Sequence, residues 1–581
     1  MLIVVVASAL AMSPNVADPD LWGHVQFGRD VLTDREIAAT TSYSFTAEGY
    51  RWINHENLSE IVMALVVDRW GPIGLVLGKF LLSLVVIISV LRFNLKNGTG
   101  MVVASIMTLL VAANLGYHWS IRPQISSFVC FTLLLLLLQF CFAGWRDRWL
   151  LKIPRESAEP VRISEALAYT PWRLRMLWLL VPLFLIWGNS HGGFVAGLCV
   201  VIAYLGMRTI ESICQGGKLS RQNAGWGITR RMILMSTVAL LITFVNPYGP
   251  GLQMWLLESL GNPRPEISDW STSQLFTLVG MKLWMLVGVS AFAIAATRKQ
   301  HDATHLVVLG LLLWQSISHF RHVPFFAIAA GFWLGPHLKS AMDRFAEEKT
   351  EQPVSRRATL AIRYGLIAVL IAAGLTLTHR LTDLRVCRDT FPVDAVDFMR
   401  KHQLHGKLVV TYDWAQYSIA AFCSEHYCDD KEKISRVAFD GRFRTCYPQP
   451  VVDMHFDFLY GTKGMQRHRD PSSPPIDPGL VLRHGQPNLV LLRRSGELTE
   501  KHMYENADEW SLLYQDAIAQ VWGRKSVYDA VESADYLSQE SRIKHDRLAT
   551  DSVTWPAINS WNNARPENGD EIQLVNRHPQ P

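Results

Sequence analysis

The sequence predicts a mainly α-helical protein that crosses a membrane about eleven times and ends in an extramembrane α/β domain. Three observations support this fold class. Of the 581 residues, 49% are hydrophobic and only 18% are charged, which is unusual for a soluble protein of this size. The apolar residues form long runs up to about residue 380, after which polar and charged residues dominate. The basic residues gather in short loops between the runs, so the net charge of +5 reflects membrane orientation and does not indicate nucleic-acid binding.

Several apolar runs approach the length of about 20 residues that a helix needs to cross roughly 30 Å of hydrocarbon. The clearest runs are 72–93, 125–144, 273–296 and 360–379. Six shorter or interrupted runs complete the series, and they are 100–116, 174–188, 191–208, 232–246, 304–318 and 322–338. The first run, 1–13, is too short to span alone and lacks the basic start of a signal peptide, so we expect a first helix that begins upstream.

The distribution of Lys and Arg orients the predicted bundle. If 1–13 runs outward, the predicted inner loops hold 21 Lys and Arg residues, whereas the outer connections 117–124, 188–191, 247–272 and 319–321 hold three. Short cytoplasmic loops accumulate basic residues, so residues 14–56 and everything after 380 are expected on the outer side. We therefore expect a multi-pass membrane protein whose C-terminal domain lies on the outer, periplasm-like side.

Unusual polar residues all fall on the outer side of this topology. Ionisable groups at a bilayer edge are costly unless they face a cavity and have a function. The residues are Asp18, Asp20, His24, Asn54, His55, Glu56, His118, Arg122, Asn189, His191, Asn246, Tyr248, Asp269, His319, Arg321 and His322.

The first outer loop, about residues 14–70, predicts two helices on the membrane surface. Apolar residues recur at helical spacing over 19–32, and 56–69 is similar. Asp18 fits a helix cap, whereas Asp20 lies inside the first turn with His24 at i+4 on the same face.

Three further motifs each allow a structural and a functional interpretation. "INHEN" at 53–57 fits either a helix cap or a site made of Asn54, His55 and Glu56. "IWGNSHGGF" at 186–194 places Asn189 and His191 in a glycine-rich break, which bilayers tolerate only beside protein or a water-filled cavity. "SHFRHVPFF" at 318–326 places a guanidinium and His322 at a helix mouth, where Arg321 could bind phosphate or extend to lipid headgroups.

Motifs of soluble enzymes do not occur in the sequence. It has no Walker loop, no dinucleotide glycine fingerprint in a strand-to-helix context, no zinc-type CxxC pair and no GxSxG elbow. No His spacing such as HExxH indicates a zinc site. Two close carboxylates would still suit a hard cation, so no cofactor is certain and a divalent metal ion remains an open alternative.

These segments resemble a group of large bacterial polytopic proteins that is similar to the membrane glycosyltransferases of the GT-C fold. The resemblance covers about residues 1–445 and is carried by "DPDLWGHVQFGRDVL", "YSFTAEGYRWINHENLSEIV", "WGNSHGGFVAGL", "VNPYGPGL", "FRHVPFFAIAA" and "FPVDAVDFM…YDWAQYSIAAF…VAFDGRF". It implies a polyprenyl-phosphate sugar donor, with mannosyltransferases and arabinosyltransferases as the related types. It also implies that Asp20 or Asp18 is the catalytic base and that Arg321 binds the donor phosphate.

We therefore expect a glycosyltransferase that moves a sugar from a polyprenyl-phosphate donor to a glycan, lipid or protein acceptor on the outer side. The expected catalytic residues are Asp20, Asp18 and His24. The expected substrate-binding residues are Asn54, His55, Glu56, Asn189, His191, Arg321 and His322. A non-enzymatic transporter or a scaffold for lipid-linked glycans is the alternative. Transporters usually have internal repeats and charges near the bilayer midplane, and the sequence has neither pattern.

The C-terminal part predicts a small α/β domain over 381–540 and a disordered tail over 541–581. Asp413, Asp440 and Arg442 either bind an acceptor glycan or cap strands. The expected outer location suggests disulfides among Cys387, Cys423, Cys428 and Cys446, with Cys423 to Cys428 and Cys387 to Cys446 as one of three possible pairings.

Overall fold

The computed structural model describes residues 1–145, 148–152, 171–215, 224–260, 264, 266–274, 276–346, 355–424, 434–462, 467, 469–494 and 497–558. The chain forms two compact units. The first comprises residues 1–38, 53–384 and 465–468, and the second comprises 39–52, 385–464 and 469–581.

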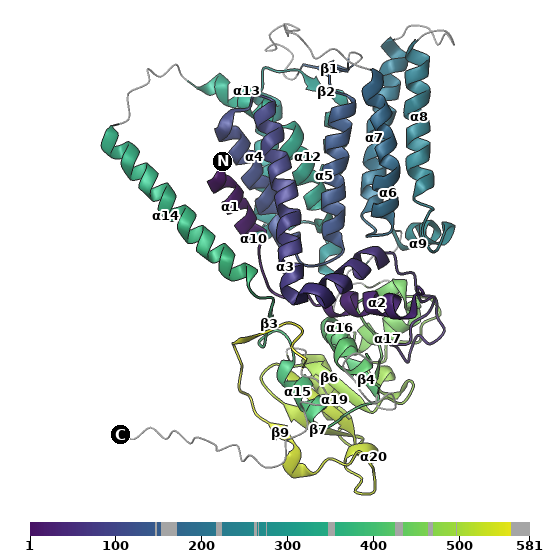
Figure 1. Ribbon diagram of the computed structural model, residues 1–581. Helices are drawn as coiled ribbons and strands as arrows, with labels where there is room; N and C mark the ends of the chain where they lie inside the picture. Colours follow the sequence, from purple (N-terminus) through teal and green to yellow (C-terminus); the bar gives the residue numbers. More distant parts are fainter. Residues whose placement is uncertain are drawn as a thin grey trace. The chain divides into compact units, whose positions relative to one another are not determined.

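The first unit begins with a short helix and a pair of helices that lie across one end of a bundle (Figure 1). These are α1 (Leu2–Ala11), α2 (Leu21–Asp34) and α3 (Asn57–Lys96). The helix α3 is two helices joined at a kink, because Gly71 has φ 68° and ψ −170° inside it and Pro72 follows. The part before the kink packs against α2, and the part after it enters the bundle. The expected surface helices at 19–32 and 56–69 and the expected run at 72–93 therefore all form helices.

The bundle continues through helices that overlap every expected apolar run. Their bounds are α4 (Gly100–Leu115), α5 (Gln124–Cys141), α6 (Leu180–Gly188), α7 (Phe194–Gln215), α8 (Ala224–Ile242), α9 (Pro250–Leu260), α10 (Leu278–Ala296), α11 (Ala303–Ser318), α12 (Val323–Trp333), α13 (Gly335–Phe345) and α14 (Arg356–Leu381). Among the described residues, six helices are long and apolar enough to cross a membrane, and α1 and α11 are shorter apolar helices. The chain is thus a multi-pass membrane protein, and the number of eleven crossings stays a prediction.

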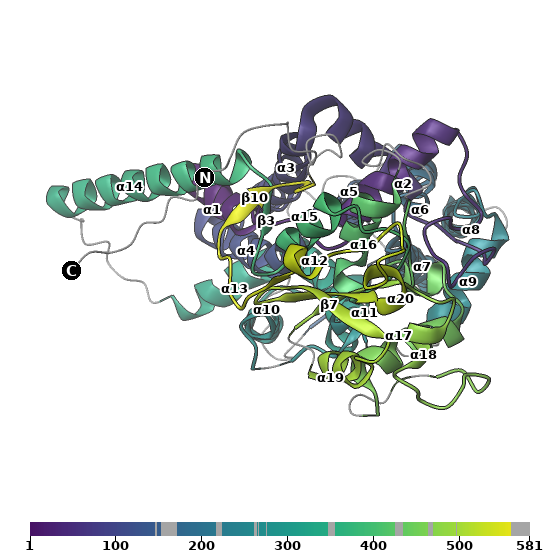
Figure 2. The same ribbon diagram turned by 90° about the horizontal axis from the view of Figure 1, so that it is seen from below.

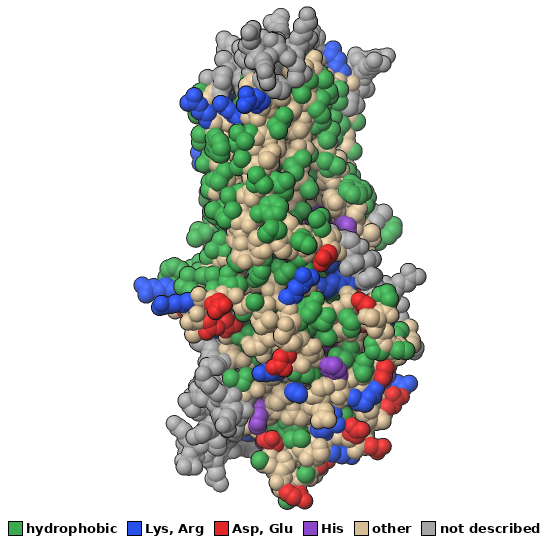
Figure 3. Space-filling model, turned by 90° about the vertical axis from the view of Figure 1, so that its right-hand side faces the viewer, with side chains coloured by type: hydrophobic (Ala, Val, Ile, Leu, Met, Phe, Trp, Pro, Cys, Tyr) green, Lys and Arg blue, Asp and Glu red, His purple; other side chains and the backbone are tan. Residues whose placement is uncertain are grey.

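The helix α12 lies at the centre of the bundle core. All of its residues are buried, as expected for a helix that is apolar on every side. A Cβ at Gly331 would lie 2.5 Å from Val111, so this glycine permits the close approach of α12 to α4. The outer faces of the bundle carry a belt of hydrophobic side chains (Figure 3). The helix α14 contacts mainly α1 and is otherwise exposed (Figures 1 and 2).

A buried ionic network ties helices together at the end of the bundle opposite α2. Arg208 of α7 lies 2.9 Å from Glu211 and 2.6 Å from Asp302, which precedes α11. Glu211 also accepts a hydrogen bond from the indole of Trp145 at 3.1 Å. Each buried charge therefore has a partner, which low-dielectric surroundings require. Two short strands, β1 (Leu150–Leu151) and β2 (His301–Asp302), pair at the same end.

The second unit is the expected α/β domain. Its six-stranded sheet has the order β5-β4-β6-β8-β7-β9, in which β5, β4 and β6 are parallel and β8 runs antiparallel to β6 and β7. The strands are β4 (Lys407–Val410), β5 (Arg436–Val437), β6 (Leu489–Arg493), β7 (Trp510–Gln515), β8 (Ala519–Arg524) and β9 (Ile543–Lys544). In Figure 2, α15 (Val393–Lys401) and α16 (Ala415–Ser418) lie on one side of the sheet, and α17 (Gln449–Tyr460), α18 (Leu480–Arg483) and α19 (Glu497–Glu505) lie on the other. A further short helix, α20 (Lys525–Tyr528), follows β8.

Two expected boundaries differ from the structure. Residues 39–52 of the first outer loop belong to the second unit, where Tyr43 and Phe45 exchange backbone hydrogen bonds with Val437 of β5. Residues 541–558 are ordered, against the expectation of a tail disordered from 541. They contain β9 and β10 (Ser552–Thr554), and β10 pairs with β3 (Arg385–Cys387). Hydrogen bonds to distant strands order this polar segment, a stabilisation that local composition does not reveal.

Asp413, Asp440 and Arg442, for which the sequence allows either glycan binding or strand capping, form internal ion pairs. Asp440 is fully buried and receives hydrogen bonds from Arg442 and Tyr447, and Asp413 lies 2.5 Å from Arg493. Their structural interpretation is therefore favoured.

The expected pairing of Cys387 with Cys446 is wrong for the described structure. Both are free thiols, and Cys446 is buried and hydrogen-bonded to Thr41. Burial raises the pKa of the Cys446 thiol to about 12. Cys428, the proposed partner of Cys423, lies outside the described residues.

Candidate active site at one end of the membrane bundle

All the site residues expected from the sequence lie in the first unit. Asp18, Asp20 and His24 come from the start of α2, and Asn54, His55 and Glu56 immediately precede α3. Asn189 and His191 lie in the break between α6 and α7, and Arg321 and His322 lie between α11 and α12. The residue pairs described below connect these four segments at one end of the bundle.

Arg122 holds the two aspartates at the start of α2. Its Nε lies 2.5 Å from Oδ1 of Asp18, and its Nη2 lies 2.6 Å from Oδ2 of Asp20. Asp18 also accepts the backbone N–H of Asp20 at 3.1 Å, in the turn before α2. The N-cap residue of α2 is Asp20, so Asp18 does not have the expected capping role, and Asp20 precedes the first turn in which the sequence placed it. Burial and the Asp18 charge raise the pKa of Asp20 above its ordinary value, and the nearby Arg122 does not cancel this effect.

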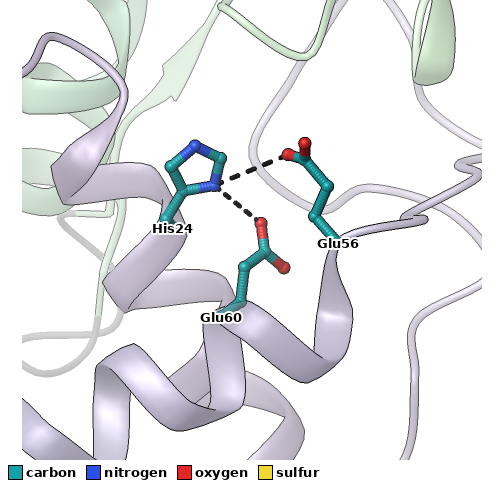
Figure 4. A group of neighbouring side chains, drawn as sticks. All are labelled: His24, Glu56 and Glu60. Atoms are coloured by element: carbon teal, nitrogen blue, oxygen red, sulfur yellow. Dashed lines mark hydrogen bonds and ion pairs between the residues drawn. The ribbon is translucent and has the colours of Figure 1, made fainter. Parts of the chain in front are cut away.

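His24 faces two carboxylates from α3 and the loop before it (Figure 4). Its Nδ1 lies 2.9 Å from Glu60 and 3.9 Å from Glu56. Burial alone would lower the pKa of His24, but the hydrogen bond to Glu60 and the charges of Glu56, Glu60 and Asp20 raise it to about 9. His24 is therefore a cation at neutral pH.

Asn54 holds the loop before α3 in place. Its side-chain amide donates to Glu60 at 2.6 Å, its carbonyl oxygen accepts the backbone N–H of Glu56 at 3.1 Å, and its own N–H donates to the hydroxyl of Tyr248 at 2.9 Å. Asn54 thus holds the loop before α3 and orients a buried carboxylate. It is not the N-cap that the sequence suggested, because the N-cap residue of α3 is Glu56.

Glu56 lies among three imidazole rings. His191 approaches its carboxylate at 3.5 Å, and His24 and His55 approach it at 3.9 Å. Burial would raise the pKa of Glu56, but the neighbouring His55, His191, His24 and Arg321 lower it overall. The carboxylate is thus ionised, and its contacts with these rings are all longer than an ordinary N–H···O bond.

The glycine-rich break brings His191 and His55 together. Nδ1 of His191 lies 2.8 Å from Oγ of Ser127 and accepts the backbone N–H of Gly193 at 3.0 Å. A Cβ at Gly193 would lie 2.4 Å from Ser127 Oγ, and one at Gly192 would lie 3.2 Å from the His55 ring. Side chains at these two positions would therefore separate α5 and the His55 loop from the break.

Arg321 has a different environment from Arg122. Its guanidinium lies over the indole of Trp270, 4.6 Å from the ring centroid, and it makes no hydrogen bond or ion pair within the part of the chain that is described. Burial lowers the pKa of Arg321 overall, although the negative charges of Asp269 and Glu56 act in the opposite direction and raise it. The guanidinium of Arg321 is planar and has no carboxylate partner in the described chain. It can therefore donate two hydrogen bonds to an anionic ligand.

Two expected binding residues have other surroundings. The amide of Asn189 donates to the backbone carbonyls of Leu185 and Val245, so it holds the end of α6. His322 lies between Trp270 and Phe325, and burial together with the charge of Arg321 lowers its pKa to about 3. His322 is therefore a neutral neighbour of Arg321.

Acidic groups outnumber basic groups in this site. Asp18, Asp20, Glu56, Glu60 and Asp269 face two guanidinium groups and the His24 imidazolium. The ligand atoms of His24, Glu56 and Glu60 also lie within 4.8 Å of one another, which is a possible set of metal ligands. One imidazole nitrogen and two carboxylate oxygens fit a divalent cation, provided that the cation displaces the proton of His24.

A small cavity lies next to the aspartates, between the ends of α1 and α14 and the membrane part of α3. Apolar side chains line it, among them Met12, Val76 and Phe80. The buried Lys79 also lines it and donates to the backbone carbonyl of Pro14. A buried lysine inside a membrane helix indicates a functional role by default.

Comparison with known proteins finds similarity at the level of structure. No family model matches the sequence, and no curated protein matches it. ArnT from Cupriavidus metallidurans, solved bound to undecaprenyl phosphate, matches 92% of this chain and 98% of its own, at 12% identity and a TM-score of 0.48. The archaeal oligosaccharyltransferase AglB from Archaeoglobus fulgidus, in complex with an inhibitory peptide and a dolichol-phosphate, matches 84% of this chain and 69% of its own, at 10% identity and a TM-score of 0.49.

Sequence reasoning left several residues of the site without a role. Arg122 and Asp269 were noted only for their outer location, and Glu60 only as a first-turn acid. Ser127 and Lys79 lie within apolar runs, where nothing in the local pattern distinguishes them. A polar residue inside an otherwise apolar run was the one available signal.

Proposed function

We propose that this protein is a membrane glycosyltransferase that moves a sugar from a polyprenyl-phosphate donor to an acceptor on the outer side of the bacterial inner membrane. The observation that carries the proposal is the meeting of Asp20, Glu56 and Arg321 at one end of a membrane bundle. Three separate segments supply these residues, and each of the three side chains has a chemical environment suited to a different part of the reaction.

Sugar transfer from a lipid phosphate needs a base and a cation. The oxygen of the acceptor hydroxyl forms a bond to the anomeric carbon, and the bond between that carbon and the phosphate oxygen breaks. The electron pair leaves with the phosphate, and the hydroxyl proton passes to a carboxylate. A cation then stabilises the charge on the departing phosphate.

Asp20 is the proposed base. Its raised pKa makes it a better proton acceptor than an ordinary aspartate, yet Arg122 keeps the carboxylate in place. Asp18, which is fixed both by Arg122 and by the start of α2, is proposed to orient this pair.

Arg321 is the proposed ligand of the donor phosphate, because its guanidinium lacks a carboxylate partner in the described chain. His24, Glu56 and His55 are proposed to contact the sugar or the acceptor.

A divalent cation at His24, Glu56 and Glu60 is a finer proposal that the excess of acidic groups supports. A bound cation would offset the negative charge that a phosphate brings to the site. Metal analysis of the purified protein, and transfer measured with and without EDTA, would test it. Full transfer by protein free of metal would contradict it.

The function itself is tested by transfer from defined donors. Purified protein in lipid nanodiscs would receive radiolabelled mannosyl, glucosyl and arabinosyl polyprenyl phosphates, with membrane glycans and lipids as acceptors. We expect labelled acceptor with at least one donor, and none with an Arg321→Ala variant. Movement of intact donor across the bilayer without any transfer would contradict the enzyme and favour a transporter.

A further inference from the structure

The hydrogen bonds around His191 fix the location of its proton. The indole N–H of Trp187 can only donate, and it lies 2.7 Å from Oγ of Ser127. Ser127 Oγ therefore accepts from Trp187, which leaves its own hydroxyl proton available for another acceptor. The neighbouring acceptor is Nδ1 of His191, at 2.8 Å.

A second donor reaches the same nitrogen. The backbone N–H of Gly193 points at Nδ1 of His191 at 3.0 Å, and a backbone N–H also can only donate. If Nδ1 carried a proton, that proton would oppose the N–H of Gly193. Nδ1 therefore acts as the acceptor, and the proton of the neutral ring is on Nε2.

Nε2 faces the centre of the site. It lies 3.5 Å from Oε1 of Glu56, which is longer than a completed N–H···O bond. A bound ligand oxygen could therefore share or take this proton donor.

We propose that Ser127 is a positioning residue that holds His191 in the tautomer protonated on Nε2, so that His191 donates a hydrogen bond toward Glu56 and the oxygen atoms of a bound sugar. This inference rests on the proposed transferase function for its role in catalysis, although the tautomer itself does not depend on that function. It excludes His191 as a general base at neutral pH, because the nitrogen that faces the site already bears a proton. It also separates His191 from the candidate metal ligands, since Nε2 could bind a metal ion only if its proton moved to Nδ1, which already accepts the N–H of Gly193.

The hydroxyl of Ser127 connects α5 to two other segments. Ser127 is fully buried in α5, and its hydroxyl joins α6 through Trp187 to the break that carries His191. The neighbouring Ser126 donates to the backbone carbonyl of Pro123 in its own segment, at 2.6 Å. Ser126→Ala is therefore a matched control for Ser127→Ala.

The experiment reads the tautomer directly. Protein labelled with ¹⁵N-histidine would be measured in nanodiscs by long-range ¹H–¹⁵N correlation, with His191 assigned from the signal that a His191→Gln variant lacks. In the wild type we expect the His191 ring to be neutral and protonated on Nε2. A ring protonated on Nδ1, or on both nitrogens at neutral pH, would overturn the proposal.

The variants test the role of Ser127. We expect Ser127→Ala to give a mixture of tautomers and to lower kcat of the transfer about 10-fold or more with little change in KM, as expected for a lost transition-state contact. Ser126→Ala should leave both readouts unchanged. Loss of transfer with an unchanged tautomer, or an unchanged tautomer with full transfer, would exclude positioning by Ser127. If no donor supports transfer by the wild type, the spectrum still decides the tautomer, so the two failures are distinguishable.

Discussion

Asp18 and Asp20 differ in environment although they are two residues apart. Both pair with Arg122, but Asp18 also accepts a backbone N–H at the start of α2, whereas Asp20 has no such bond among the described contacts. Their roles should therefore separate on substitution.

We expect Asp20→Asn to lower transfer by about 10²-fold or more, the usual scale for losing a general base. The amide keeps the size of the side chain, so expression and membrane insertion should stay normal. Asp18→Asn should cost less, and Asp34→Asn, an exposed position at the end of the same helix, should cost nothing. Donor-dependent transfer by purified variants is the measurement. A fully active double variant at Asp18 and Asp20 would contradict the catalytic assignment.

His24 gives a prediction about stability and pH. Its pKa in the folded protein is about 9, above the ordinary value of 6.5. Its stabilising ion pair is therefore fully present below about pH 6.5 and is lost as pH rises through about 9. The melting temperature in detergent should fall over this range more steeply for the wild type than for His24→Asn. His379→Asn, at an exposed histidine of α14, should behave like the wild type. Parallel curves for the wild type and His24→Asn would count against the charged His24.

At the scale of elements, the kink of α3 separates a surface helix from a membrane helix. Gly71 has φ 68° and ψ −170°, a conformation that only glycine adopts without strain. The kink orients the first part of α3, which carries Glu60, along α2 with its His24. The geometry of the site thus depends on a backbone conformation about ten residues away from it.

Gly71→Ala should therefore destabilise the protein by about 1–3 kcal/mol, the usual cost of such a strained conformation. Gly78 lies in the membrane part of the same helix, where nothing is within 4 Å of an added Cβ and its φ is ordinary. Gly78→Ala should be neutral or slightly stabilising, since alanine favours helices. Unfolding midpoints in denaturant would compare the two. If both substitutions changed the free energy of unfolding equally, the backbone conformation at Gly71 would not require glycine.

At the scale of the whole molecule, the ends of α1 and α14 lie together and therefore on the same side of the membrane. Arg380 at the end of α14 donates to the carbonyl of Leu10 at the end of α1, at 3.0 Å, and Asn15 donates to the carbonyl of Asp383 at 2.9 Å. The chain therefore leaves the first unit, after Leu384, on the same side of the bundle as Asp18 and Asp20. This agrees with the outer location that the count of Lys and Arg predicts for both.

Reporter fusions test this topology. Fusions after residues 215 and 346 should be cytoplasmic, and fusions after 260 and 384 should be external, because the basic loops remain on the cytoplasmic side. Alkaline phosphatase and a fluorescent protein would report the two sides. A cytoplasmic signal after 384 would overturn both the charge count and the proposed location of the active site.

The sequence by itself determined the fold class and most of the helices. Long apolar runs have one stable form in a bilayer, because every backbone N–H and C=O must be paired within the segment. The same reasoning predicted the helices at 19–32 and 56–69, which the structure contains, since amphipathic spacing is a local signal. The outer location of the polar residues stays a prediction.

Only the tertiary structure decided which of these residues meet and how each is charged. Arg122 pairs with two aspartates, His24 and His191 both approach Glu56, and Ser127 hydrogen-bonds to His191. These contacts join residues that lie between 32 and 135 positions apart in the sequence. The ordered residues 541–558 and the placement of 39–52 in the second unit likewise depend on strand pairing with distant partners. Such contacts depend on how the segments pack, which local composition does not reveal. The resulting burial and neighbouring charges shift the pKa values of Asp20 and His24.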